Sequence, residues 1–153
     1  MKKKTILLIL IFFVVSSCGF KPIYSSKKTN FDLVKIETLE KNKINSKIQN
    51  NLNNISNDES INKYKLVINS NKEKRISSKD KKGNAQTLTM VISTSIKIYK
   101  ENNIISDINF SEEFRYDNNS NKFDLSQYEN NIENNLVDKI ISNIISHILS
   151  LEA

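Results

Sequence analysis

A long, regular alternation of apolar and polar residues constrains the fold of this chain more than any other feature. It spans Thr87 to Tyr99, where every second residue is apolar except Thr94. Side chains of a β-strand point alternately to the two faces of a sheet, so this segment is expected to have one buried and one solvated face. A sheet of this kind needs a second layer over its buried face. The residues predicted to lie on that face are Leu88, Met90, Ile92, Ile96 and Ile98, with Thr94 among them.

The C-terminal segment can supply the second layer. Its apolar residues spread over about half the circumference of a helix, as expected for a helix that lies flat on a sheet. We predict that this helix begins at a capping box, Ser126 to Glu129, in which the serine and glutamate side chains cap backbone N–H groups. The apolar stripe consists of Leu136, Val137, Ile140, Ile141, Ile144, Ile145, Ile148 and Leu149.

Three further strands follow from the same reasoning. We expect them at Phe31 to Leu39, at Tyr64 to Ile68 and at roughly Ile104 to Tyr116. The last would follow the long alternating strand through a tight turn at Asn102-Asn103, since asparagine tolerates the positive φ angles of such turns. Its inward face would carry Ile108, Phe110, Phe114 and Tyr116.

A second helix is predicted between the first two strands. Asn42 can serve as its N-cap, and the helix should end at the turn Asn57 to Ser60. Its narrow apolar stripe is Ile44, Ile48, Leu52 and Ile55. The order of elements is therefore strand, helix, three strands, helix. This order favours an α+β two-layer sandwich, with two helices packed on one face of a four-stranded mixed sheet.

The N-terminus has the pattern of a lipoprotein signal. Lys2, Lys3 and Lys4 precede an apolar run from Ile6 to Val15, and two serines then lead to Cys18. We interpret residues 1–17 as a signal peptide that is cleaved between Ser17 and Cys18, whose thiol is lipidated. A membrane-spanning anchor is the alternative, but a span needs about 20 apolar residues. A secretory signal with a chance cysteine is a second alternative.

Cys18 is the only cysteine, so the chain can form no internal disulfide and no cysteine-based metal site. Acyl chains on Cys18 would hold the protein firmly on a membrane. Gly19 follows, where aspartate is the usual signal for retention in the inner membrane, so we expect the outer membrane. Residues 18–30 would form a lipidated tether and residues 31–153 a single domain. The formal charge of +6 falls to +3 once the three signal-peptide lysines are removed.

Residues suited to catalysis are scarce. His147 is the only histidine, and its place near the end of the last helix favours a structural role. Glu112 and Glu113 are adjacent on a predicted strand, so their side chains should point to opposite faces and cannot act as a carboxylate pair. Glycine-rich phosphate loops and serine nucleophile motifs are missing from the sequence. We therefore expect no enzymatic activity, no cofactor and no metal.

A cluster of cations lies between the second and third predicted strands. On the loop of a hairpin, such a cluster could bind phosphate or carboxylate groups. The alternative is a solvated turn in a lysine-rich protein. The cluster consists of Lys72, Lys74, Arg75, Lys79, Lys81 and Lys82.

The segment Cys18-Gly19-Phe20-Lys21-Pro22-Ile23-Tyr24 resembles the mature start of the LptE family, the LPS-assembly lipoproteins of the outer membrane, in its alphaproteobacterial form. The predicted order of elements is also similar to the family fold. The resemblance implies that the chain binds and plugs an LPS-translocating β-barrel of the LptD type, assists its assembly and helps deliver lipopolysaccharide to the outer leaflet. It makes Phe20, Pro22 and Tyr24 candidate barrel contacts and the basic cluster a candidate LPS site. The alternative is a lipoprotein subunit of another envelope lipid-transport or secretion complex.

Overall fold

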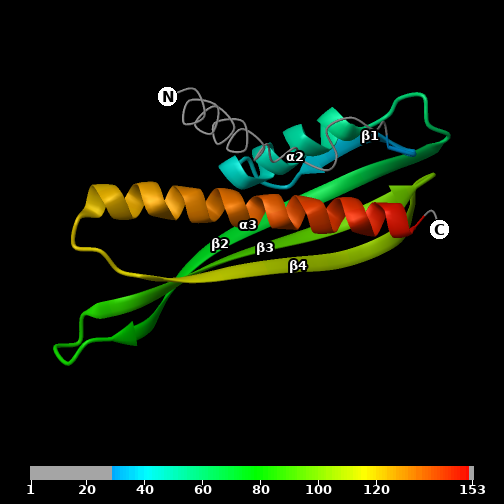
Figure 1. Cartoon of the computed structure of the whole chain (residues 1–153). Helices are drawn as coiled ribbons and strands as arrows, with labels where there is room; N and C mark the ends of the chain where they lie inside the picture. Colours follow the sequence, from blue (N-terminus) through cyan, green and yellow to red (C-terminus); the bar gives the residue numbers. More distant parts are fainter. Residues whose placement is uncertain (1–28, 152–153) are drawn as a thin grey trace, which may run out of the picture.

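The structure is a computed structural model that describes residues 29–151 (Figure 1). The predicted signal peptide, Cys18 and the candidate barrel contacts Phe20, Pro22 and Tyr24 lie outside the described residues. The elements are β1 (Phe31–Thr38), α2 (Lys43–Ile55), β2 (Asn62–Lys79), β3 (Ala85–Lys100), β4 (Asn103–Asp117) and α3 (Lys122–Ser150).

The four strands form one mixed sheet in the order β1-β2-β3-β4. β1 and β2 are parallel and are connected through α2, whereas β2, β3 and β4 are joined antiparallel by two hairpins. Both helices cover the same face of the sheet, and no described element covers the other face (Figure 1). The predicted α+β two-layer sandwich is therefore confirmed.

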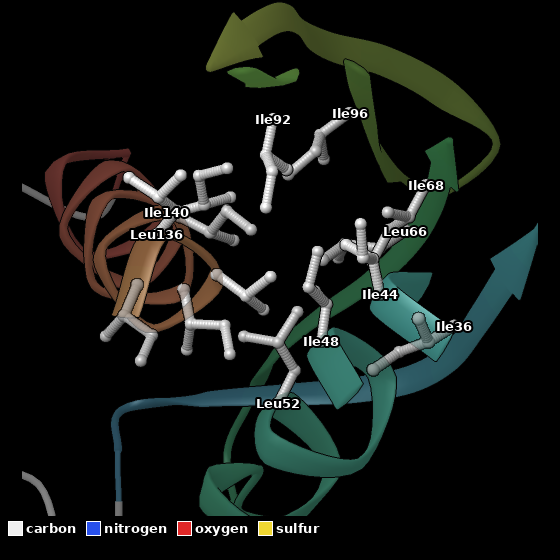
Figure 2. Packing of buried hydrophobic residues seen from close by; sticks show 14 of the residues in the cluster. Ile36, Ile44, Ile48, Leu52, Leu66, Ile68, Ile92, Ile96, Leu136 and Ile140 are labelled. Carbon is white, nitrogen blue, oxygen red and sulfur yellow. The ribbon is translucent and has the colours of Figure 1, made fainter. Parts of the chain in front are cut away.

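One apolar core lies between the helices and the sheet. Isoleucine and leucine side chains of α2 and α3 point toward those of β2 and β3 (Figure 2). Burying one such side chain stabilises a fold by about 1.5–3 kcal/mol. The predicted inward residues of β3 are all buried, including Thr94, whose hydroxyl lies 2.9 Å from that of Ser70. The labelled core residues in Figure 2 are Ile36, Ile44, Ile48, Leu52, Leu66, Ile68, Ile92, Ile96, Leu136 and Ile140.

A β-bulge in β1 changes which residues point toward the core. The register against β2 shifts between Leu33 and Lys35, so Leu33 and Ile36 are both buried although three positions separate them. Val34, at the bulge, is 56% exposed. Thr29 and Asn30, the last residues of the expected tether, are hydrogen bonded to the end of α2 and to the turn that follows it.

The last helix starts earlier than the capping box predicts. Its N-cap is Asn121, whose side chain accepts hydrogen bonds from the backbone N–H groups of Phe123 and Asp124. Ser126 therefore lies inside α3, and the predicted start there is wrong. Asparagine is as good an N-cap as serine, and it begins a helix that includes Leu125 and Ile132 in its buried face. Of the predicted stripe, Leu149 alone is exposed.

The turn between β3 and β4 is shifted by one residue from its predicted place. Glu101 and Asn102 have positive φ angles of 51° and 72°, whereas Asn103 is the first residue of β4. Asn102 thus has the expected conformation, but its partner in the turn is Glu101. The N-cap of α2 is Asn42, as predicted, and its side chain accepts a 2.8 Å hydrogen bond from the Asn45 backbone N–H.

Candidate functional site

The basic cluster lies mostly on a strand and not on a loop. β2 continues to Lys79 and pairs with β3 along nearly its whole length, so Lys72, Lys74, Arg75 and Lys79 all belong to the strand. Lys81 and Lys82 alone lie in the turn between β2 and β3. The predicted long loop is therefore wrong. The strand was missed because lysines occupy its inward positions opposite the core residues Met90 and Ile92, so no apolar alternation reveals it.

Lys72 points toward the helices, where a carboxylate of α3 binds it. Its Nζ donates a 2.6 Å hydrogen bond to Glu133 Oε2, and Lys43 Nζ of α2 lies 3.6 Å from Glu133 Oε1. Glu133 is 5% exposed and lies among buried side chains of α3. A buried carboxylate needs such partners, because an unpaired buried charge is strongly destabilising. Lys72 therefore links β2 to α3.

Lys74 has a similar partner one helical turn earlier. Its Nζ donates hydrogen bonds of 2.9 and 3.0 Å to the two carboxylate oxygens of Glu129, and the Tyr116 hydroxyl donates a third of 2.7 Å. Burial favours a higher pKa for Glu129, but the hydrogen bonds from Tyr116 and Lys74 outweigh it and hold that pKa below its ordinary value. Burial, with the hydrogen bond to Glu129, raises the pKa of the Tyr116 hydroxyl.

The spacing of these two ion pairs follows from helix and strand geometry. Four residues of an α-helix rise about 6 Å, and two residues of a strand rise about 6.6 Å. Glu129 and Glu133 on α3 can therefore face Lys74 and Lys72 on β2 at the same spacing. Both lysines occupy positions that continue the inward face of β2 beyond its apolar part. Their charges are satisfied within the domain.

Arg75 lies on the opposite face of β2. Its guanidinium donates two hydrogen bonds of 2.7 Å to the carboxylate of Glu73, two residues earlier. This contact lowers the pKa of Glu73 and raises that of Arg75. Both side chains are exposed, so the pair contributes little to stability and can exchange partners.

The tip of the hairpin holds the remaining three cations. Asp80 organises the turn: its side chain accepts hydrogen bonds from the backbone N–H groups of Lys82 and Asn84, each at 2.8 Å, and Gly83 has a φ of 85° that favours glycine. The Asn84 side chain and these N–H groups lower the pKa of Asp80. Lys79, Lys81 and Lys82 are exposed and form no ion pair with any residue between 29 and 151. The candidate anion site is thus reduced to these three.

The tip lies at the far end of the domain from the start of β1. Phe31 pairs with Asn62, the first residue of β2, and the tip follows the last residue of the same strand (Figure 1). A strand of 18 residues at ~3.3 Å per residue spans about 55 Å. The cations therefore lie at the opposite end of this long strand from the point where the N-terminal segment enters the fold.

The uncovered face of the sheet is rich in small neutral polar residues. They occupy the middle of β2, β3 and β4, where the hydroxyls of Ser93 and Ser111 lie 3.1 Å apart. Asparagine and serine side chains both donate and accept hydrogen bonds, so this face suits a polar partner surface. Its members are Asn69, Asn71, Ser93, Ser95, Asn109 and Ser111.

The residues considered for catalysis have structural surroundings. His147 Nε2 lies 2.8 Å from the Ser106 hydroxyl, and the imidazole and the Phe110 ring form a T-shaped pair with centroids 6.2 Å apart. Glu112 and Glu113 pair with Ile92 and Val91, so they lie on opposite faces as predicted. Among residues 29–151, no group of histidine, cysteine or acidic residues gathers to hold a metal ion, and no helix is long and apolar enough to span a membrane.

The sequence matches no known protein-family model, and it matches no curated protein. Solved structures do share the fold. Rare lipoprotein B from Shewanella oneidensis is 11% identical with a TM-score of 0.57, over 80% of this chain and 98% of that one. A minor lipoprotein from Acinetobacter baumannii is 12% identical with a TM-score of 0.59, over 77% and 90%. Lipoprotein B from Nitrosomonas europaea is 13% identical with a TM-score of 0.58, over 88% and 92%. At these identities the likeness shows a common fold.

Proposed function

We propose that this chain is an outer-membrane lipoprotein of the LptE kind, which binds and plugs an LPS-translocating β-barrel of the LptD type. The observation that carries the proposal is its fold, which is similar to that of rare lipoprotein B, a protein also called LptE. The lipoprotein signal ending at Cys18 and the segment Gly19 to Tyr24 support it independently. The role is binding and support of barrel assembly, without catalysis.

The surface of the domain suits a plug. The interior of a large barrel is polar, so a plug must offer hydrogen-bonding groups to the barrel wall. The uncovered sheet face offers amides and hydroxyls, which bond to a polar wall without the desolvation cost of buried charges. Most cations near the core are already paired with carboxylates of the domain.

The elongated shape suggests an orientation. Cys18 precedes Phe31 by 13 residues in the sequence, so the lipid anchor is connected to the domain through the start of β1. The hairpin tip follows the last residue of β2, at the other end of the sheet. With the acyl chains in the periplasmic leaflet, the tip would reach into the barrel, where Lys79, Lys81 and Lys82 could engage the phosphates of lipopolysaccharide.

Affinity purification from detergent-solubilised outer membranes tests the proposal. The tagged full chain should retain one large β-barrel, identified by mass spectrometry as LptD-like. A Cys18→Ser variant, which cannot be lipidated, serves as the control for membrane targeting. Recovery of a different envelope complex, with no barrel of this type, would reject the proposal in favour of another transport or secretion role.

A further inference from the structure

β4 forms a border of the sheet. It pairs with β3 along its length, and no other described strand lies on its outer side (Figure 1). A border strand presents a row of backbone N–H and C=O groups that can pair with another chain. β4 has 15 residues, which is longer than the usual strand of about 3–10 residues.

The charge of β4 differs in sign from that of the whole chain. Its carboxylates are Asp107, Glu112, Glu113 and Asp117, against the single cation Arg115, although the chain has a formal charge of +6. Among the described residues, only Asp107 of these four forms an ion pair, with Lys97 at 3.3 Å. Glu113 and Asp117 are exposed and lie on the uncovered face of the sheet.

An apolar groove runs beside the same edge, on the helix side. It has a volume of about 620 Å³ and lies between β4 and α3. Phe114 of β4 and Tyr128 of α3 line it and are 43% and 47% exposed. Ile132 and Leu136 are buried beneath it. Polar and charged residues of α3 complete the lining: Asn131, Asn135, Asp138, Lys139 and Ser142.

We propose that this edge and groove bind an extended strand of a partner protein that adds to the sheet beside β4. Backbone hydrogen bonds to β4 would supply affinity, and alternate side chains would supply specificity. Side chains on one face of the added strand would enter the groove beside Phe114 and should be apolar. Those on the other face would meet Glu113 and Asp117 and should be cationic at positions four residues apart. The position between them faces Arg115 and should carry no cation.

The negative charge of β4 favours a basic partner strand over a second copy of the chain. Two β4 edges would bring two strands of net charge −3 together, and like charges across a strand pair are destabilising. A basic strand has the complementary sign. The inference goes beyond the barrel-plug proposal and does not depend on which protein supplies the strand.

A designed peptide tests it. Val-Lys-Val-Ser-Val-Lys-Val has the required alternation and lysine spacing, and it reads the same in both directions, so it suits parallel or antiparallel addition. We expect a fluorescently labelled form to bind the full chain in detergent micelles, measured by anisotropy at low salt. NMR amide shifts should change in β4 and along the groove. The control peptide replaces both lysines with glutamate and should not bind.

Variants of the chain locate the site. Glu113→Gln with Asp117→Asn should weaken peptide binding about tenfold, since each opposite-charge cross-strand pair contributes modestly. Asp58→Asn with Glu101→Gln removes the same charge from two exposed turns and should leave binding unchanged. The proposal is overturned by an absence of peptide binding, by equal losses in the two double variants, or by amide shifts confined to β1. Self-association of the free chain through β4, detected by sedimentation, would also overturn it, since the occupant would then be a second copy.

Discussion

Glu129 and Glu133 determine which of the neighbouring lysines are available to bind a ligand. They lie one helical turn apart on α3 and bind Lys74 and Lys72, and Lys43 approaches Glu133 as well. From the sequence alone, these lysines would be expected to be available to bind phosphate. The structure instead assigns them to the attachment of α3 to the distal part of β2. The members of the basic cluster that form no ion pair with residues 29–151 are at the hairpin tip, where the Asp80 carboxylate binds backbone N–H groups instead.

Glu129 should give the stability of the domain a specific pH dependence. Burial favours a higher pKa, but the hydrogen bonds from Tyr116 and Lys74 hold the folded pKa below the ordinary 4.5. A carboxyl with a lowered folded pKa adds stability above its unfolded pKa and loses it as pH falls through the folded value. Glu129→Gln should therefore lower the free energy of unfolding by about 1–2 kcal/mol near neutral pH. That difference should fade below pH 4.5, as measured by urea unfolding. A difference that persists in acid would contradict the assignment, and Glu101→Gln provides an exposed control.

The tip lysines make a separate prediction about lipopolysaccharide. Changing Lys79, Lys81 and Lys82 together to glutamine should weaken LPS binding about tenfold at low salt, with a smaller effect at high salt, because exposed charges are screened. The control changes Lys41, Lys122 and Lys139 to glutamine, which removes the same charge elsewhere on the surface. Equal losses in both triple variants would indicate that net charge alone matters, and unchanged binding would leave the tip as a solvated turn.

At the scale of elements, periodicity identified every strand and helix among residues 29–151 but misplaced several ends. Apolar patterns report where an element contacts the core, so β3 and the buried stripe of α3 could be predicted in detail. The distal part of β2 places lysines where the core would need apolar residues, so it has no apolar pattern and was predicted as a loop. The start of α3 was misplaced because the sequence offers two possible N-caps, Asn121 and Ser126. The local sequence does not determine which of the two caps the helix.

The two possible caps of α3 can be distinguished by substitution. Asn121→Ala removes the side chain that accepts hydrogen bonds from Phe123 and Asp124, and it should lower stability by about 1 kcal/mol. Ser126→Ala lies within the helix, where alanine is the better helix former, so stability should change by less than about 0.5 kcal/mol. Thermal unfolding followed by circular dichroism measures both. The reverse ranking would place the helix start at the capping box.

At the scale of the whole molecule, the sandwich depends on one core shared by both helices and the sheet. Ile92 of β3 and Ile144 of α3 are fully buried in it. Changing either to aspartate buries a charge without a partner and should cost several kcal/mol, about half of a small domain's stability or more. Ile61→Asp is the matched control, because Ile61 is 84% exposed. A melting curve unchanged by the core substitutions would reject the helix-on-sheet packing.

The fold class could be predicted because the helices and the strands each have a characteristic spacing of apolar residues in the sequence. The binding surfaces could not, since they depend on which charges meet in space. Lys72 and Glu133 are 61 residues apart, and no local pattern relates them. Phe114 and Tyr128 line the groove beside β4, and they are exposed because no element within residues 29–151 covers them. Neither feature has a sequence motif.

Photocrosslinking in living cells tests the barrel-plug role most directly. A photoreactive amino acid would replace, one at a time, three exposed residues on different sides: Ser93 on the uncovered sheet face, Asn51 on α2 and Ser146 on α3. A plug is surrounded by its barrel, so all three positions should crosslink to the same LptD-like protein. Crosslinks to that barrel from one side alone, or to a different protein from all three, would contradict the plug role.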